Sequence, residues 1–140
     1  MEIFVQIASY RDPQLIPTID NMLENSKNPE NLRIGVCHQY HPEDEFSDLS
    51  KYGDDDRFRI IDVLYSESKG ACWARHQIQQ VYSGETYTLQ IDSHMRFEKD
   101  WDTTLIEMIN QLQEKGHKKP LLTGYVPSFS PKNYPDGRVN

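Results

Sequence analysis

Asp92 and His94 stand two positions apart, directly after an apolar run. The run, residues 87–91, alternates in the manner of a strand, and polar and charged residues follow it. In an extended chain, side chains two positions apart point to the same side, so both could face one ion while Ser93 points away. A hard carboxylate oxygen beside a borderline imidazole nitrogen suits Mn²⁺, and Zn²⁺ and Fe²⁺ are also chemically possible. The spacing indicates a metal site at a strand end, with Asp92 and His94 as ligands.

The spacing alone leaves a simpler alternative open. Asp-x-His occurs by chance in many proteins, and Asp92 would then cap a turn while His94 would be an ordinary loop residue. Three other histidines have no motif to join and are expected to be ordinary loop or strand-end residues: His38, His41 and His117. Support for a metal site therefore has to come from other segments.

A second segment has the residues of an anion site. After Gly70, apolar residues keep helical spacing over residues 71–81, which predicts a helix that buries one face. Gly70 allows close backbone approach at the helix start, and Arg75 in the first turns could make a paired contact with a diphosphate. A surface salt bridge is the alternative for Arg75, and the helix pattern alone favours it.

A third segment follows the first predicted strand. Residues 3–8 have apolar side chains on both faces of a strand, and a helix then starts with Asp12 as N-cap and Pro13 at the first helical position. Open α/β sheets bind ligands at the carboxyl ends of their strands. Surface packing of the polar side chains explains the segment equally well. The candidate substrate-binding residues here are Ala8, Ser9, Tyr10 and Arg11.

The remaining pattern completes an α/β chain. Residues 39–57 are rich in carboxylates but lack the alternation and glycine of a calcium-binding EF-hand, so we expect a solvated loop with one short turn of helix. The order β-α-β-β-α-β-α-β predicts a mainly parallel sheet flanked by helices. The further predicted elements are strands at Leu32–His38, Phe58–Tyr65 and Lys119–Val126, and a helix opened by Asp100 and closed by Lys115-Gly116.

Composition limits the function classes. The chain has 140 residues, enough for one domain, and a formal net charge of −7, which disfavours nonspecific nucleic-acid binding. Cys37 and Cys72 both lie in predicted buried elements without CxxC spacing, and we expect two reduced core thiols. No basic leader followed by a long apolar run is present, and no stretch is long enough to cross a bilayer. We expect a cytoplasmic protein.

Three ordered segments together resemble a known family. They are Ile3 to Asp12, Gly70 to His76, and Leu89 to Phe97 with Trp101-Asp102. The chain resembles the GT-A glycosyltransferases, and within them the Skp1-type polypeptide N-acetylglucosaminyltransferases, which act on hydroxyproline. In that family Asp92-Ser93-His94 looks like the local form of the Asp-x-Asp motif, which holds Mn²⁺ against the diphosphate of a sugar nucleotide.

The resemblance implies a Rossmann-like fold and a reaction. A sugar, expected to come from UDP-GlcNAc, would pass to a hydroxyl acceptor such as hydroxyproline of a protein, with Mn²⁺ or another divalent cation assisting. The substrate-binding residues would be those after the first strand together with Gly70, Arg75, Asp92 and Ser93. The motifs point to no particular catalytic residue and to neither a retaining nor an inverting outcome.

Length departs from the family pattern. Residues 1–126 would form the nucleotide-sugar-binding half, and residues 127–140 would lead toward an acceptor-binding half beyond this chain. The chain would then be a fragment, or a shortened relative that binds the donor without transfer. A non-catalytic nucleotide-sugar-binding or interaction module is thus an alternative. A metal-dependent phosphate-ester hydrolase is another, although it would usually have more carboxylates and histidines at the strand ends.

Overall fold

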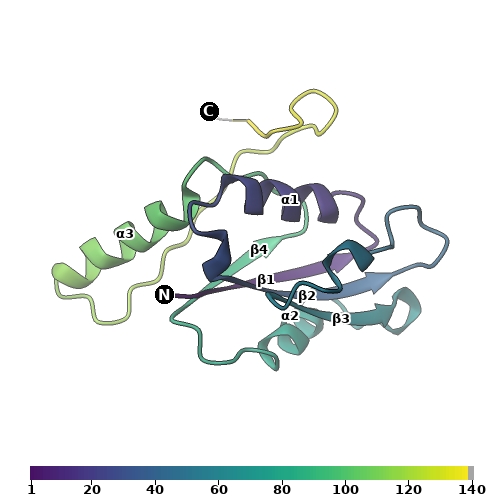
Figure 1. Cartoon of the computed structure of the whole chain (residues 1–140), viewed down its shortest axis with the longest axis horizontal. Helices are drawn as coiled ribbons and strands as arrows, with labels where there is room; N and C mark the ends of the chain where they lie inside the picture. The colour runs from purple at the N-terminus through teal and green to yellow at the C-terminus, as the bar shows by residue number, and fades with distance from the viewer. Residues whose placement is uncertain (139–140) are drawn as a thin grey trace. The chain divides into compact units, whose positions relative to one another are not determined.

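The computed structural model describes residues 1–138, and it contains four strands and three α-helices. Three short 3₁₀ helices join them (Figure 1). The strands are β1 (Ile3–Tyr10), β2 (Leu32–Tyr40), β3 (Phe58–Leu64) and β4 (Tyr87–Asp92), and the α-helices are α1 (Leu15–Asn25), α2 (Ala71–Gln79) and α3 (Trp101–Glu114). The 3₁₀ helices are η1 (Pro29–Asn31), η2 (Ser50–Tyr52) and η3 (Tyr65–Glu67). No helix of the described residues is long and apolar enough to span a membrane.

The chain forms two compact units. The first comprises Met1–Asp20 and Glu30–Met95 and contains the whole sheet, the start of α1 and all of α2. The second comprises Asn21–Pro29 and the chain from Arg96 onward, and it contains the end of α1 and all of α3. All of the candidate site residues belong to the first unit.

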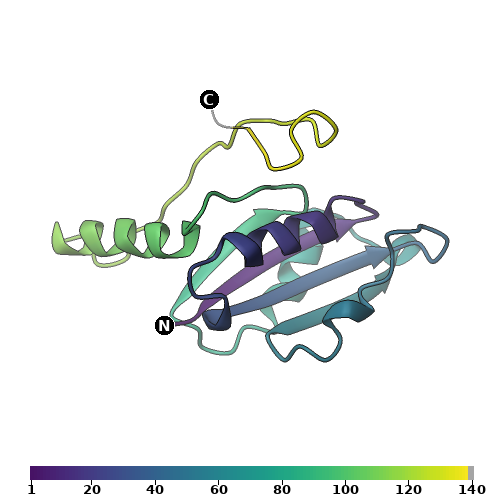
Figure 2. The same cartoon turned by 45° about the horizontal axis from the view of Figure 1, so that its top comes forward.

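The sheet of the first unit is parallel throughout, with the order β3-β2-β1-β4. Residues 15–20 of α1 cover one face and α2 covers the other (Figures 1 and 2). Sheets covered on both faces have strands with apolar side chains on both sides, which explains the pattern of β1. The predicted α/β fold with a Rossmann-like parallel sheet is confirmed.

The core divides between the two faces. Phe4 of β1 and Cys37 of β2 pack with Ala74 and Ile78 of α2. Because side chains alternate along a strand, the neighbours of Phe4 and Cys37 face α1 instead. Gly35 permits the approach of α2, since a Cβ there would lie 2.8 Å from the Ile78 Cγ2 atom. Four apolar residues on the α1 face are fully buried: Val5, Ile7, Ile34 and Val36.

In the second unit α3 is joined to residues 26–28 through one carboxylate. Asp102 is buried and accepts hydrogen bonds from the Lys27 and Asn28 backbone N–H groups and from the Ser26 hydroxyl. Burial raises the pKa of Asp102, but these bonds outweigh burial and the pKa is lowered. Asp100, predicted to open the helix, stands before α3 as expected, but with a φ of 60° and without a side-chain cap.

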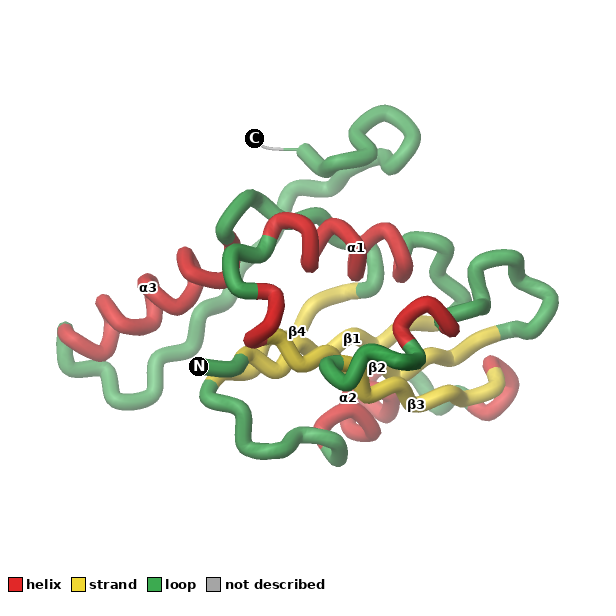
Figure 3. Tube along the Cα trace, viewed as in Figure 1, coloured by secondary structure: helices red, strands yellow, loops and turns green. Residues whose placement is uncertain are grey.

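The strand predicted at Lys119–Val126 is wrong. The described chain after α3 has neither helix nor strand (Figure 3), and Leu121 and Tyr125 are 86% and 107% exposed. A strand is stabilised by pairing with another, and this segment pairs with none of the described strands. Of the tail predicted from residue 127 to residue 140, the last two residues lie outside the described part of the chain.

Candidate functional site

The strand order places the candidate residues at one crevice. The chain fills the sheet from β1 to β2 to β3 and then returns to the other side of β1 with β4, so the direction reverses between β1 and β4. Open α/β sheets bind ligands outside the carboxyl ends of the strands at such a switch point. Ala8 and Asp92 are paired across these two strands. Residues far apart in the sequence, Ala8–Arg11 and Asp92–His94, therefore meet at the same edge.

Asp92 and His94 form an exposed pair at this edge. The His94 Nε2 atom lies 3.9 Å from the Asp92 Oδ2 atom, and the two side chains are 61% and 58% exposed. The Nδ1 atom of His94 lies 2.9 Å from the Asp12 Oδ2 atom. One carboxylate oxygen and one ring nitrogen thus face each other in open space. Within the described residues, no group of three or more His, Cys, Asp or Glu side chains could hold a metal ion.

Ser93 follows the last residue of β4 and contacts the same carboxylate oxygen as His94. Its side chain is buried, and its hydroxyl donates a 2.6 Å hydrogen bond to the Asp12 Oδ2 atom. Its backbone carbonyl accepts a hydrogen bond from the Thr18 hydroxyl. The structure therefore places Ser93 beneath the site, and direct contact of Ser93 with a substrate stays a prediction.

The start of α2 faces the same edge. Gly70 precedes the helix with a φ of 98°, a conformation that side chains rarely allow, and no atom lies within 4 Å of a Cβ built there. The free N–H groups of the first turn give this helix end a partial positive charge. Arg75 follows one turn later, with its Nη2 atom 3.6 Å from the Asp92 Oδ1 atom. A carboxylate, an arginine and a helix start are thereby assembled around one open region.

Next to Gly70 lies a cavity of about 430 Å³. Tyr10, Gln39, Tyr65 and Ser68 line it together with Gly70. The Gln39 amide is held in place because its Nε2 donates to the Ser9 carbonyl and its Oε1 accepts from the Ser68 hydroxyl. Two phenol rings and an oriented amide provide both an apolar surface and hydrogen-bonding groups.

Ser9 and Arg11 are placed differently from Tyr10. The Ser9 side chain is buried on the α1 face of the sheet, where its Oγ atom has no hydrogen-bond partner. Arg11 has a φ of 45° and makes two hydrogen bonds to Asp44, of 2.9 and 3.0 Å. It also lies over the Tyr65 ring, 5.4 Å from the ring centre. The Arg11 guanidinium keeps the pKa of Asp44 below its usual value. The Arg11 guanidinium is therefore already paired with a carboxylate of the loop that follows β2.

Three residues of this region were not identified from the sequence. Asp12 was predicted only as a helix cap, and Gln39 and Tyr65 were assigned to a loop and to a strand end. A signal existed for all three, because each follows or ends a predicted strand on the side where ligands bind. Their joint location depends on the strand order, which the sequence pattern does not specify.

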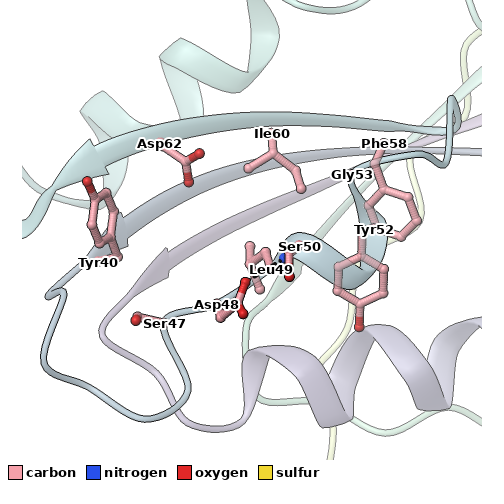
Figure 4. Close-up of a pocket in the computed structure, with 10 residues that line it drawn as sticks. All are labelled: Tyr40, Ser47, Asp48, Leu49, Ser50, Tyr52, Gly53, Phe58, Ile60 and Asp62. Atoms are coloured by element: carbon pink, nitrogen blue, oxygen red, sulfur yellow. Dashed lines mark hydrogen bonds between the residues drawn. The ribbon is translucent and has the colours of Figure 1, made fainter.

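A larger cavity, of about 550 Å³, lies elsewhere in the first unit (Figure 4). It is bounded by the segment Ser47–Gly53 and by β3, with the Tyr52 and Phe58 rings stacked 4.5 Å apart. Asp62 also lines it and forms a pair with the buried His38, at 3.0 Å between Oδ1 and Nδ1. None of the candidate site residues lines this cavity.

Comparison with protein families identifies the class of protein. A family model described as Glycosyltransferase (GlcNAc) matches residues 2–54 and 46–140. The chain belongs to this glycosyltransferase family. No curated protein matches it. Membership in the GlcNAc glycosyltransferase family makes the chain a transferase, with a sugar donor and an acceptor as its partners.

Proposed function

We propose that this chain is the nucleotide-sugar-binding part of a metal-dependent GT-A glycosyltransferase, with UDP-GlcNAc as donor and a hydroxyl group, such as hydroxyproline of a protein, as acceptor. The observation that carries the proposal is the Asp92–His94 pair, which lies with Arg75 at the switch point of the sheet. The family match supports glycosyl transfer.

Different residues would bind the uridine and the diphosphate of the donor. The uridine would occupy the cavity lined by Tyr10 and Tyr65, where a ring can lie against phenol side chains and Gln39 presents a fixed amide. The diphosphate would lie at the start of α2, near Gly70 and Arg75. A chain with a net charge of −7 requires local positive charge to bind such an anion.

The Asp92–His94 pair would supply two ligands of a divalent cation, and the diphosphate and water would complete its coordination. One carboxylate oxygen and one imidazole nitrogen are a donor set that suits Mn²⁺. Arg75 is already paired with Asp92, and Arg11 with Asp44. A bound cation would therefore add the positive charge that a diphosphate needs. When bound, it would stabilise the negative charge that develops on the departing UDP.

The reaction would exchange one bond for another at the sugar. The bond between the anomeric carbon and the UDP oxygen breaks, and a bond from that carbon to the acceptor oxygen forms. The proton of the acceptor hydroxyl passes to a base. In this scheme Arg75 binds the leaving diphosphate, Asp92 and His94 would hold the cation beside it, and none of the three handles the acceptor proton.

Titration calorimetry with UDP, with and without Mn²⁺, tests the proposal. We expect tighter UDP binding with Mn²⁺, loss of this gain in Asp92→Asn, and a smaller loss in His94→Ala, because water can replace a neutral ligand more readily than a charged one. Asp62→Asn is the matched control, since Asp62 is also an exposed aspartate paired with a histidine.

Equal UDP affinity with and without Mn²⁺ would refute the metal-dependent mode of binding. Unchanged metal binding by a folded Asp92→Asn variant would move the ion elsewhere, first to the acidic segment at residues 54–56. Incubation with UDP-GlcNAc adds a second readout. Release of free GlcNAc indicates turnover, whereas binding without any release would indicate a module that only holds the donor.

A further inference from the structure

Asp12 links the candidate metal pair to the start of α1. It follows β1 and precedes the helix, and its Oδ1 atom accepts a 2.8 Å hydrogen bond from the Gln14 backbone N–H. Its side chain is only 16% exposed, although it is a carboxylate at the edge of a sheet. A carboxylate buried to this extent requires hydrogen-bond donors around both oxygens.

The second oxygen of Asp12 contacts the loop after β4. The Oδ2 atom accepts a hydrogen bond of 2.6 Å from the Ser93 hydroxyl and lies 2.9 Å from the Nδ1 atom of His94, which is 82 residues away in the sequence. An ionised carboxylate can only accept hydrogen bonds, so the His94 Nδ1 atom must carry the hydrogen. In neutral His94 the lone pair then lies on Nε2, the atom that is 3.9 Å from Asp92.

The loop that carries His94 is fixed to α1 at further points. The buried Thr18 hydroxyl donates to the Ser93 carbonyl at 3.0 Å and accepts from the Met95 backbone N–H at 2.9 Å. His94 is therefore held on both sides by Thr18 and through its ring by Asp12. A hydrogen bond from one ring nitrogen to a carboxylate fixes the tautomer and the ring orientation of a metal-binding histidine.

We propose that Asp12 is a positioning residue that fixes the tautomer and the ring direction of His94 for a divalent cation. The inference rests on the proposed function, because it assigns His94 to the same ion. Asp12 is not itself assigned as a ligand, since Gln14, Ser93 and His94 already engage its two oxygens. A carboxylate that receives the other ring N–H of a metal-binding histidine raises the affinity for the metal.

Asp12→Asn is the decisive variant. Asparagine has the same shape, but its amide N–H can donate to the His94 Nδ1 atom, which moves the hydrogen to Nε2 and removes the lone pair from the metal side. Asp12→Ser is the second variant, because serine retains a cap for the Gln14 N–H without a carboxylate for His94. Asp20→Asn is the matched control, as it makes the same charge change on α1 at a residue paired with Lys51 and Tyr52.

Two readouts separate positioning from folding. In ¹⁵N spectra of the metal-free protein, neutral His94 should have its hydrogen on Nδ1, and Asp12→Asn should shift it toward Nε2. In Mn²⁺ titrations with UDP, followed by electron paramagnetic resonance, both Asp12 variants should bind Mn²⁺ about 10- to 100-fold more weakly than the wild type. Asp20→Asn should match the wild type in both measurements.

The outcomes distinguish this inference from the function on which it rests. A wild-type protein that binds no Mn²⁺ overturns the metal site itself, and the role of Asp12 with it. A wild type that binds Mn²⁺, together with a folded Asp12→Asn variant of equal affinity, overturns only the positioning role. If Asp12→Asn does not fold, Asp12→Ser decides, and unchanged affinity in that variant is the refuting result.

Discussion

Removal of the Arg75 side chain should affect ligand binding far more than stability. In the free protein, Arg75 is 35% exposed and its nearest approach to the Asp92 carboxylate is 3.6 Å, too long for a strong hydrogen bond. Exposed ion pairs contribute about 0.2–1 kcal/mol to folding. We therefore expect Arg75→Ala to lower the free energy of unfolding by no more than about 1 kcal/mol.

The effect on nucleotide binding is larger because the diphosphate would be the main partner of Arg75. A charge-assisted hydrogen bond contributes about 1.5–3 kcal/mol, which corresponds to a rise of about 10- to 150-fold in the Kd for UDP. Affinity for Mn²⁺ alone should not fall, since Arg75 would compete with the proposed cation for Asp92. A weaker affinity for UDP together with an undiminished affinity for Mn²⁺ is the result expected of an arginine that lies between a carboxylate and a diphosphate.

Urea unfolding and titration calorimetry with UDP and Mn²⁺ measure the two effects on the same variants. Arg33→Ala is the matched control, because Arg33 pairs with Glu2 at the amino ends of the strands, away from the site. It should lose stability and keep its affinity for UDP. If Arg75→Ala loses stability while its Kd for UDP stays at the wild-type value, Arg75 is structural and the reasoning is wrong.

Three further predictions concern packing, thiols and pH. Gly35→Ala should destabilise the fold by about 1–3 kcal/mol in urea unfolding, because the new methyl group would meet Ile78 at 2.8 Å. In native alkylation, Cys72 should react quickly because it is exposed, whereas Cys37 should react only on unfolding, since it is buried and burial raises the pKa of its thiol. Because the pKa of Asp102 is lowered in the folded state, its contribution is present above the pKa of the unfolded chain and is lost as the pH falls through the folded value. The difference in unfolding free energy between wild type and Asp102→Asn should therefore shrink on acidification.

The periodicity of apolar residues predicted most of the helices and strands, because the buried face of an element repeats with the same period. The strand expected to end at Asp92 does end there. The loop predicted at residues 39–57 begins only at residue 41, because Gln39 and Tyr40 extend β2, and it contains one short 3₁₀ helix, as expected. In α1 the first helical residue is Leu15 and not Pro13, although the Asp12 carboxylate still accepts a hydrogen bond from the Gln14 N–H directly before the helix. Helix starts are hard to define from sequence because a capped turn and the helix that follows it use the same residues.

The sequence analysis was wrong about burial and contacts that depend on how the helices and strands pack together. Cys72 was expected in the core, but it lies on the exposed side of α2, while Ala74 and Ile78 face the sheet. A nine-residue helix has too few apolar positions to define its buried face without the sheet. The contact of Asp12 with His94 was not foreseen either, since residues that far apart meet only through the placement of β4 beside β1.

Because β1 lies between β2 and β4, it should be the part of the sheet that opens least often. This strand pairs with neighbours on both sides, and Phe4, Val5 and Ile7 are completely buried. Its amide hydrogens should exchange only through global opening, because no local fluctuation frees a strand held from both edges. Ala8 near the end of β1 is paired with Asp92, so the Asp92–His94 pair follows directly from the part of the first unit that should exchange most slowly. Its geometry should therefore persist for as long as that unit is folded.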